Sequence, residues 1–296
     1  MLHSDFVHLH VHTQYSLLDG AWLIEELIKL AHSFKMPALA ITDHGNMFGA
    51  IDFYLAAKKI GIKPVIGCEV YIAPESRHKK TAHSIQDASH HFILLAKDKT
   101  GYGNLMKLVS IGYLEGFYYR PRIDKEALSQ YSKGLIGLTA CLKGEVACLL
   151  QQDKINDAIK VADDFNNIFE KGSFYLELQE NKIPEQAKVN KGKIKISKEL
   201  NIPIVATNDL HYLKREHASA HEALLCIQTQ ATLDDPDHMH FQTDEFYFKD
   251  ANEMSQLFKD VPEALVNTIE IANKCNLEID LEEIHLPKYE PPHNQD

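Results

Sequence analysis

Three histidines stand at every second position near the start of the chain, in the stretch HLHVHT at residues 8–13. Successive side chains of a β-strand point to opposite faces, so His8, His10 and His12 would share one face. Such a face belongs either to a polar edge strand or to a metal site, because neutral imidazole is the commonest metal ligand in proteins. The residues elsewhere in the chain have to decide between these two interpretations.

Further residues of metal-binding type are found where other apolar, strand-like runs end. In parallel α/β folds the functional side chains gather at the carboxyl ends of strands. The residues that close such a run, follow it or lie in the next loop are His10, His12, Asp19, Asp43, His44, Glu69, Cys141, Asp209 and His211. A single aspartate there is commonly a helix cap, as Asp43 could be, and a single cysteine is commonly a buried apolar residue. Five strand ends that supply such residues together favour the metal site.

The mixture of side chains indicates which metals and which chemistry to expect. Histidine, carboxylate and one thiolate suit zinc, manganese or iron better than calcium or magnesium. Their number exceeds what one tetrahedral ion needs, so we expect two or more divalent ions. Clustered ions can hold the attacking and leaving oxygens of a phosphate ester. The sequence has no GxxxxGK[ST] or GxSxG motif, so P-loop and serine-hydrolase chemistry have no support.

Composition sets further bounds. With 296 residues, 45% hydrophobic and 25% charged, the chain is typical of a globular protein. The net charge of −11 argues against a broad basic face for duplex DNA, although carboxylates that bind metals count as negative here. Five cysteines without CxxC spacing fit a reducing compartment. The absence of a long apolar run or a secretory signal predicts a cytoplasmic protein without a membrane partner.

Apolar runs alternate with amphipathic segments over most of the chain. The expected strands are 6–12, 37–42, 63–72, 92–97, 134–140, 174–179 and 203–207, and the clearest expected helices are 21–34, 48–61 and 155–171. This alternation predicts an α/β fold with a parallel sheet that closes like a barrel. The irregular stretches are 73–90 and 228–249, and a helical tail follows at about 250–276.

Two further segments have simple compositional interpretations. Residues 286–296 are polar and rich in proline, so we expect a linker after a single domain at 1–285. The lysines of 188–198 predict a solvated helix face.

The motifs HLHVHT, SLLDG, ITDHGN, GCE and TNDLH together resemble the polymerase and histidinol phosphatase (PHP) superfamily. The flanking stretches PALAITDHGNMFGAIDFY, GIKPVIGCEVY and NIPIVATNDLHY are similar to the N-terminal PHP domains of bacterial replicative DNA polymerase III alpha subunits. The resemblance extends from about Phe6 to Pro287. It implies a distorted seven-stranded (β/α)7 barrel of the PHP type with a centre for three metal ions.

The resemblance also implies nine metal ligands. They are His10, His12 and Asp209 for one ion, His91 and Cys141 for a second, Asp19, His44 and His211 for a third, and Glu69 as a bridge between the first two. His91 rests on the motif HHFILLAKD alone, with His90 as its competitor. His8 is expected to support the ligands or to be structural.

The function implied by the resemblance is metal-dependent 3′–5′ exonuclease activity, that is, proofreading beside a polymerase, with Asp19, His12 and Glu69 as catalytic residues. A small-molecule phosphatase of the histidinol-phosphate type and a metal-stabilised scaffold without turnover stay open as alternatives. Arg120 and Arg122, in YYRPR, could hold the phosphates of a strand or belong to a salt-bridged surface loop. The expected partners are a single-stranded or mispaired DNA 3′ end, a polymerase region that this chain lacks, and other replicase subunits.

Overall fold

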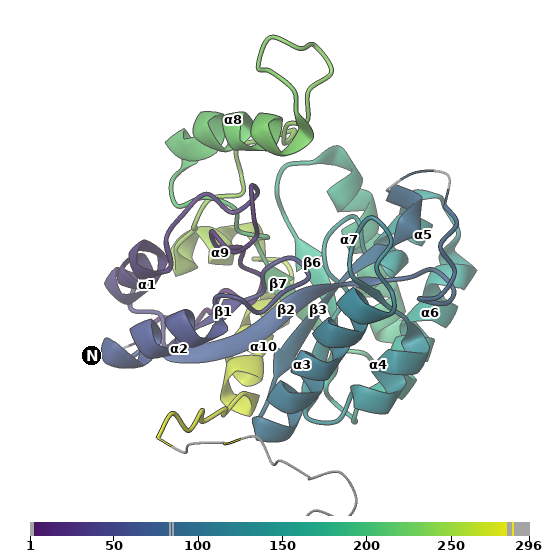
Figure 1. Ribbon diagram of the computed structural model, residues 1–296, viewed down its shortest axis with the longest axis horizontal. Helices are drawn as coiled ribbons and strands as arrows, with labels where there is room; N and C mark the ends of the chain where they lie inside the picture. Colours follow the sequence, from purple (N-terminus) through teal and green to yellow (C-terminus); the bar gives the residue numbers. More distant parts are fainter. Residues whose placement is uncertain (1–2, 83, 85, 283–285, 287–296) are drawn as a thin grey trace, which may run out of the picture.

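A curled sheet of seven strands organises residues 3–82, 84, 86–282 and 286, which the computed structural model describes (Figure 1). The strands are β1 Ala38–Ile41, β2 Lys63–Ile72, β3 His90–Ala96, β4 Arg122–Ile123, β5 Leu135–Leu138, β6 Phe174–Gln179 and β7 Ile204–Thr207. Their order is β1-β2-β3-β5-β6-β7, with β4 paired to β2. The predicted α/β class with a curled, barrel-like sheet is confirmed.

Strand β3 departs from the predicted parallel arrangement, because it runs antiparallel to both β2 and β5. The connection from β2 to β3 contains only the short helix η1, Gln86–Ala88, in its described part and no crossover helix, so the chain returns along the same edge. As a result, the start of β3 lies beside the end of β2, where His91 pairs with Tyr71. The missing crossover is the physical reason why the all-parallel prediction is wrong here.

The expected strand at 6–12 is extended but forms only an isolated bridge, between Val11 and Leu210. The backbone N–H of Val11 donates to the hydroxyl oxygen of Thr42 at 2.8 Å, so a side chain replaces part of the regular ladder. The N–H of His12 donates to the carbonyl of Leu210 at 3.0 Å. This segment therefore lies between the end of β1 and the end of β7, and it draws the two edges of the sheet together.

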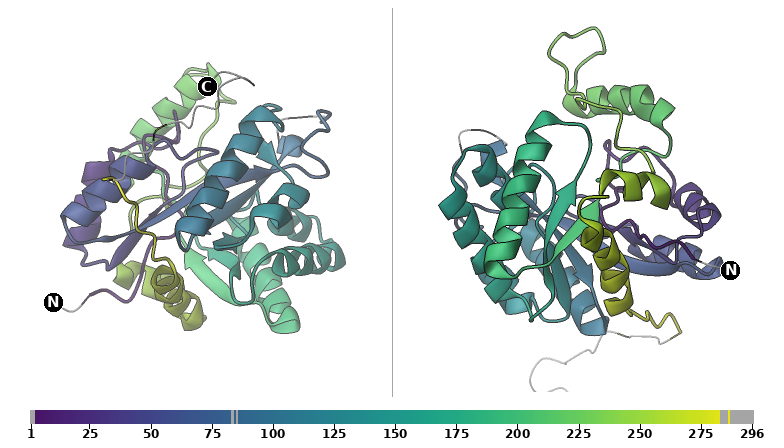
Figure 2. Two further views of the ribbon diagram at one scale, coloured as in Figure 1. Left: turned by 60° about the horizontal axis from the view of Figure 1, so that its bottom comes forward. Right: turned by 180° about the vertical axis from the view of Figure 1, so that it is seen from behind.

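Helices cover the outside of the curled sheet (Figure 2). They are α1 Ile24–Ser33, α2 Ala50–Lys59, α3 Lys99–Leu114, α4 Lys125–Tyr131, α5 Glu145–Gln151, α6 Ile155–Ile168, α7 Pro184–Leu200, α8 Ala218–Thr229, α9 Ala251–Leu257 and α10 Pro262–Lys274, with the short helix η2 Arg215–His217 before α8. In α1 the buried residues are Ile24, Leu27, Ile28 and Ala31, the spacing of one helical face. The predicted helices at 21–34, 48–61 and 155–171 are present with shorter ends.

The lysine-rich segment 188–198 lies in α7, and its predicted solvation is wrong for one residue. Lys193 is fully buried, and its ammonium group donates to the backbone carbonyls of Glu177 at 2.7 Å and Ala140 at 3.2 Å. Helical periodicity is the reason, because position 193 shares the buried face of α7 with Val189 and Ile196.

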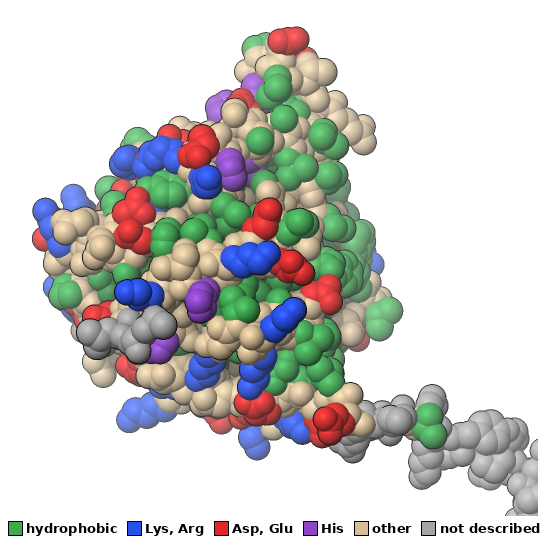
Figure 3. All heavy atoms as spheres, turned by 90° about the vertical axis from the view of Figure 1, so that its left-hand side faces the viewer, with side chains coloured by type: hydrophobic (Ala, Val, Ile, Leu, Met, Phe, Trp, Pro, Cys, Tyr) green, Lys and Arg blue, Asp and Glu red, His purple; other side chains and the backbone are tan. Residues whose placement is uncertain are grey.

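Helix α8 and the segment after it project from one end of the sheet as a separate lobe (Figures 1 and 2). On the face shown in Figure 3, lysine and arginine side chains are interspersed with acidic ones and form no single basic patch. Among the described residues, no helix combines the length and the apolar character that crossing a membrane requires. The predicted linker 286–296 lies outside the described residues except for position 286, and the domain boundary at 285 stays a prediction.

Candidate metal centre

The carboxylate of Glu69, near the end of β2, lies at the centre of a buried cluster of histidines. Its Oε2 is 2.7 Å from His10 Nε2 and 3.6 Å from His12 Nε2. Its Oε1 is 3.0 Å from His44 Nδ1 and also contacts Nδ1 of His91. The two oxygens of one carboxylate therefore face two different pairs of histidines, as a bridging ligand requires.

The first group consists of His10, His12, Glu69 and Asp209, whose ligand atoms all lie within 4.8 Å of one another. Asp209 Oδ1 is 3.1 Å from His10 Nε2 and 3.3 Å from His12 Nε2, and these two nitrogens are 3.1 Å apart. Asp209 Oδ1 is also buried without a hydrogen bond of good geometry to any described residue. A divalent ion fits this donor set, because it would satisfy the carboxylate oxygen and both nitrogens at once.

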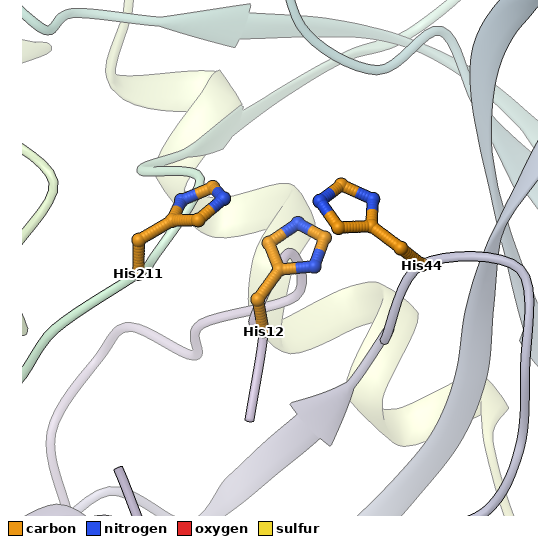
Figure 4. Close-up of side chains that lie close together, drawn as sticks. All are labelled: His12, His44 and His211. Atoms are coloured by element: carbon orange, nitrogen blue, oxygen red, sulfur yellow. The ribbon is translucent and has the colours of Figure 1, made fainter. Parts of the chain in front are cut away.

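The second group gathers around Asp19, which lies in the loop after the amino-terminal segment. Asp19 Oδ2 is 3.0 Å from His44 Nε2, and its Oδ1 is 3.6 Å from His211 Nε2. Figure 4 shows that the rings of His12, His44 and His211 converge from three separate segments. The His12 ring stacks on both neighbours, with centroids 4.0 Å from His44 and 4.5 Å from His211. The two groups are therefore contiguous.

The third pair is His91 and Cys141, which lie 3.7 Å apart from Nδ1 to Sγ. Cys141 follows β5, and His91 is the second residue of β3. The structure brings His91, and not its neighbour His90, against Glu69. The antiparallel direction of β3 explains why His91 begins its run instead of ending it.

Burial and nearby charges together shift the pKa values of this cluster. Burial would raise the pKa of the Glu69 carboxyl, but His91 and His44 hold it well below its usual range. Burial lowers the pKa of His211 to about 3 despite the nearby Asp19. Burial also raises the pKa of the Cys141 thiol, and the neighbouring carboxylates add to that effect. A bound divalent cation would reverse this last effect, because a coordinating thiol loses its proton.

Unusual backbone conformations coincide with several of these side chains. Asp209 itself has φ 53°, Ala140 before Cys141 has φ 54°, and Leu18 before Asp19 has φ 60°. Residues other than glycine seldom adopt this left-handed backbone conformation, and such strain persists only where the surrounding structure imposes it. The fold therefore holds these ligand-type residues at some cost in backbone energy.

Two buried residues that sequence reasoning missed contact this cluster. Glu177 in β6 accepts the Nδ1–H of His10 at 2.7 Å, and His221 in α8 lies 3.3 Å from Asp19 through its Nε2. Glu177 had a usable signal, since it is a charged residue near the end of the apolar run FYLELQ. His221 had none, because it lies on a helix away from any strand end.

Two residues of metal-binding type outside the nine predicted ligands have distinct positions. His8 packs against Phe6 and Phe248 and donates through Nε2 to the carbonyl of Lys249 at 2.9 Å, while burial lowers its pKa to about 3. Asp43 accepts the hydroxyl hydrogen of Ser16 at 2.7 Å, and Ser16 Oγ is 3.0 Å from Nδ1 of His12. Asp43 is therefore placed to orient a ligand and not to be one.

The two arginines of YYRPR have different environments. Arg122 is 2% exposed, and its guanidinium donates to four backbone carbonyls. A phosphate contact by Arg122 is therefore not supported, because the backbone already takes up its donors. Arg120 is exposed, and its guanidinium lies 5.8 Å from the ring centroid of Tyr71, which is 5.2 Å from that of His91. Of these two arginines, Arg120 is therefore the one whose side chain is exposed near the cluster.

A pocket of about 360 Å³ opens onto the cluster. Seven of the nine predicted ligands line it, namely Asp19, His44, Glu69, His91, Cys141, Asp209 and His211. The other two, His10 and His12, are fully buried. The volume is within the usual range for small-ligand sites, roughly 300–1,000 Å³.

Comparison with known sequences identifies a matching family and several similar proteins. The PHP domain family matches residues 8–181. DNA polymerase III subunit alpha of Treponema pallidum is 45% identical over 99% of this chain, and that of Borreliella burgdorferi is 48% identical over 98%. The polymerase subunit of Thermus aquaticus is 44% identical over 93% of this chain. The chain spans about a quarter of the length of these relatives, between 23% and 25%.

Two solved structures align with this chain at low sequence identity. An amidohydrolase from Chromobacterium violaceum aligns with a TM-score of 0.47 and 15% identity, over 69% of this chain and 87% of that one. A two-domain protein from Bacteroides vulgatus, described as containing a predicted PHP-like metal-dependent phosphoesterase, aligns with a TM-score of 0.40 and 15% identity. That alignment covers 70% of this chain and 52% of the other.

Proposed function

The chain belongs to the PHP domain family, and from that premise we propose that it is a metal-dependent phosphodiesterase that removes nucleotides from DNA 3′ ends. The observation that carries the proposal is the complete set of nine ligand-type residues gathered around Glu69. A family member that served only as a scaffold could lose ligands freely. This chain retains all nine as metal-binding types.

Two or three divalent ions, of zinc, manganese or iron, would be held by these nine residues in the three groups described above. When bound, such ions polarise a phosphate ester and lower the pKa of a water molecule. Asp19, His12 and Glu69 are the residues that we expect to govern the rate, as the family resemblance implies, and each faces at least two other residues of the cluster.

The other residues of the chain bind and orient. Arg120 is the candidate for holding a phosphate of the strand, since its guanidinium is exposed beside Tyr71 and His91. Glu177 holds the imidazole of His10 in one tautomer, with Nε2 toward the cluster. The open pocket admits a flexible strand end more readily than an intact duplex, whose rigid backbone could not enter it.

Similarity to DNA polymerase III alpha subunits over nearly the whole chain supports a nucleic-acid substrate. It also supports three kinds of partner: the remaining polymerase region, a DNA 3′ end and other replicase subunits. Polymerisation itself would depend on that remaining region. The same similarity supports a cytoplasmic location, where a bacterial chromosome is copied.

The deciding experiment compares substrates on the metal-loaded chain. We expect release of mononucleotides from single-stranded or mispaired 3′ ends with manganese or zinc, faster than release of phosphate from histidinol phosphate. Faster hydrolysis of histidinol phosphate would favour the small-molecule phosphatase. A folded, metal-loaded protein that releases nothing would favour the scaffold.

A further inference from the structure

A second cluster of metal-binding side chains lies outside the nine-residue centre, on the projecting lobe. It consists of Glu222 in α8 with His238 and His240 in the segment after that helix. One ligand atom from each of the three residues lies within 4.8 Å of the other two. His240 is exposed, and Glu222 and His238 are partly buried, so an ion could reach them from solvent.

The backbone of the lobe presets both imidazoles for metal binding. His238 donates its Nδ1–H to the carbonyl of Asp235 at 2.6 Å, and its Nε2 lies 2.6 Å from Glu222 Oε1. His240 donates its Nδ1–H to the carbonyl of His238 at 3.1 Å. Metal-binding histidines almost always donate their second N–H to a carbonyl or carboxylate in this way. Each ring is therefore turned so that Nε2 is the ligand atom.

We propose that Glu222, His238 and His240 form a separate site for one zinc-type divalent cation. Two imidazoles and one carboxylate are a ligand set that zinc accepts, with a fourth position left for water. The cation would take the place of the hydrogen between His238 Nε2 and Glu222 Oε1. Tetrahedral zinc sets its ligand atoms about 3.3 Å apart, and the three ligand atoms already lie within 4.8 Å of one another.

The position of this site gives it a role in covering the pocket. The same segment contributes Met239, His240 and Phe241 to the pocket wall. The ring of Phe241 packs against His211 and His221, with centroids 4.9 Å and 4.7 Å away. A cation that joins this segment to α8 would hold Phe241 against the nine-residue centre. The site stands on its own geometry and does not depend on which reaction that centre performs.

Zinc stoichiometry tests the proposal. We would dialyse the chain against zinc chloride and compare the wild type with Glu222→Gln, His240→Gln and the control His78→Gln, which removes an exposed histidine beside Glu115. We expect the first two variants to bind one zinc ion fewer than the wild type and the control. Equal stoichiometry in all four proteins would overturn the site.

Limited proteolysis gives a second readout that does not depend on counting ions. Zinc should slow cleavage between residues 230 and 243 at least about tenfold in the wild type and in His78→Gln, whose lobe residues are unchanged. It should not do so in His240→Gln. Equal zinc protection in His240→Gln would show that the ion acts at the nine-residue centre, and it would overturn the proposal.

Discussion

The Nδ1–H of His10 donates to Oε1 of Glu177 at 2.7 Å, and both side chains are fully buried. This hydrogen bond determines the tautomer of His10, so that Nε2 faces Glu69 and Asp209. A carboxylate behind a histidine also makes that histidine a stronger metal ligand. Glu177 therefore belongs to the candidate centre although it does not face the ion position itself.

Replacing Glu177 with glutamine should weaken metal binding about 10- to 100-fold, because the supporting carboxylate is lost while the shape is kept. The measurement is competition with a chelator of known affinity. Glu199→Gln is the matched control, since Glu199 is an exposed glutamate in α7. Unchanged affinity in Glu177→Gln would mean that the His10–Glu177 contact is structural only.

Sequence reasoning found most of the centre because strand ends have a recognisable pattern. Residues such as His10 and Asp209 close or follow an apolar run, so the sequence alone predicts that they lie at one edge of the sheet. The structure brings these side chains together. The grouping around Glu69 came only from the family resemblance. The contacts made by its two oxygens depend on side-chain direction at the end of β2, which no linear pattern contains.

Three residues depart from what their local sequence predicts for one physical reason, which is that tertiary contacts override the local pattern. His91 did not fit the strand-end rule because β3 is antiparallel. Arg122 and Lys193 looked like surface residues by composition, but backbone carbonyls accept their hydrogen bonds in the interior. Their burial depends on pairing with carbonyls from distant segments, so charge alone predicts the wrong environment.

Asp19→Asn should lower the rate of 3′-end hydrolysis at least about tenfold, which corresponds to about 1.4 kcal/mol in the activation barrier. The substitution removes the charge that faces His44 and His211 but keeps the shape of the side chain. Steady-state rates on a labelled oligonucleotide measure the effect. Asp260→Asn, at an exposed position, is the control. Equal rates in wild type and Asp19→Asn would exclude a catalytic role for Asp19.

Removal of metal should lower the melting temperature. Ions that bind only the folded state stabilise it. One bound ion contributes about 2.7 kcal/mol when the free ion concentration is 100 times the dissociation constant, which corresponds to about 5 °C in the melting temperature of a chain of this size. Without ions, the carboxylates and imidazoles around Glu69 stay buried together. Calorimetry with and without EDTA, with metal content measured, tests this, and re-added metal should restore the transition. An unchanged melting temperature after confirmed removal contradicts the prediction.

Arg120→Gln should reduce kcat/KM on an oligonucleotide at least about tenfold, because one charged hydrogen bond to phosphate contributes about 1.5–3 kcal/mol. The melting temperature should stay the same, since Arg120 is exposed. Arg122→Gln should do the opposite and lower the melting temperature, because it removes donors from four buried carbonyls. If Arg120→Gln leaves kcat/KM intact, the strand must follow another path.

Lys193 should make stability depend on pH in the alkaline range. Burial lowers its pKa to about 8 in the folded protein, against about 10.4 in the unfolded chain. Below about pH 8 the buried ammonium is charged and its full destabilising contribution is present. Between about pH 8 and 10.4 the unfolded chain binds more protons than the folded protein, so the free energy of unfolding rises with pH. Relative to Lys193→Met, the wild type should gain on the order of 2 kcal/mol between pH 7.5 and 10.5. Denaturant unfolding of both proteins in EDTA measures this difference in the free energy of unfolding. The contributions of the other titrating groups are the same in both proteins and cancel in the difference. Parallel pH profiles would mean that Lys193 keeps an ordinary pKa, and that its ammonium group is less isolated from water than its contacts with Glu177 and Ala140 imply.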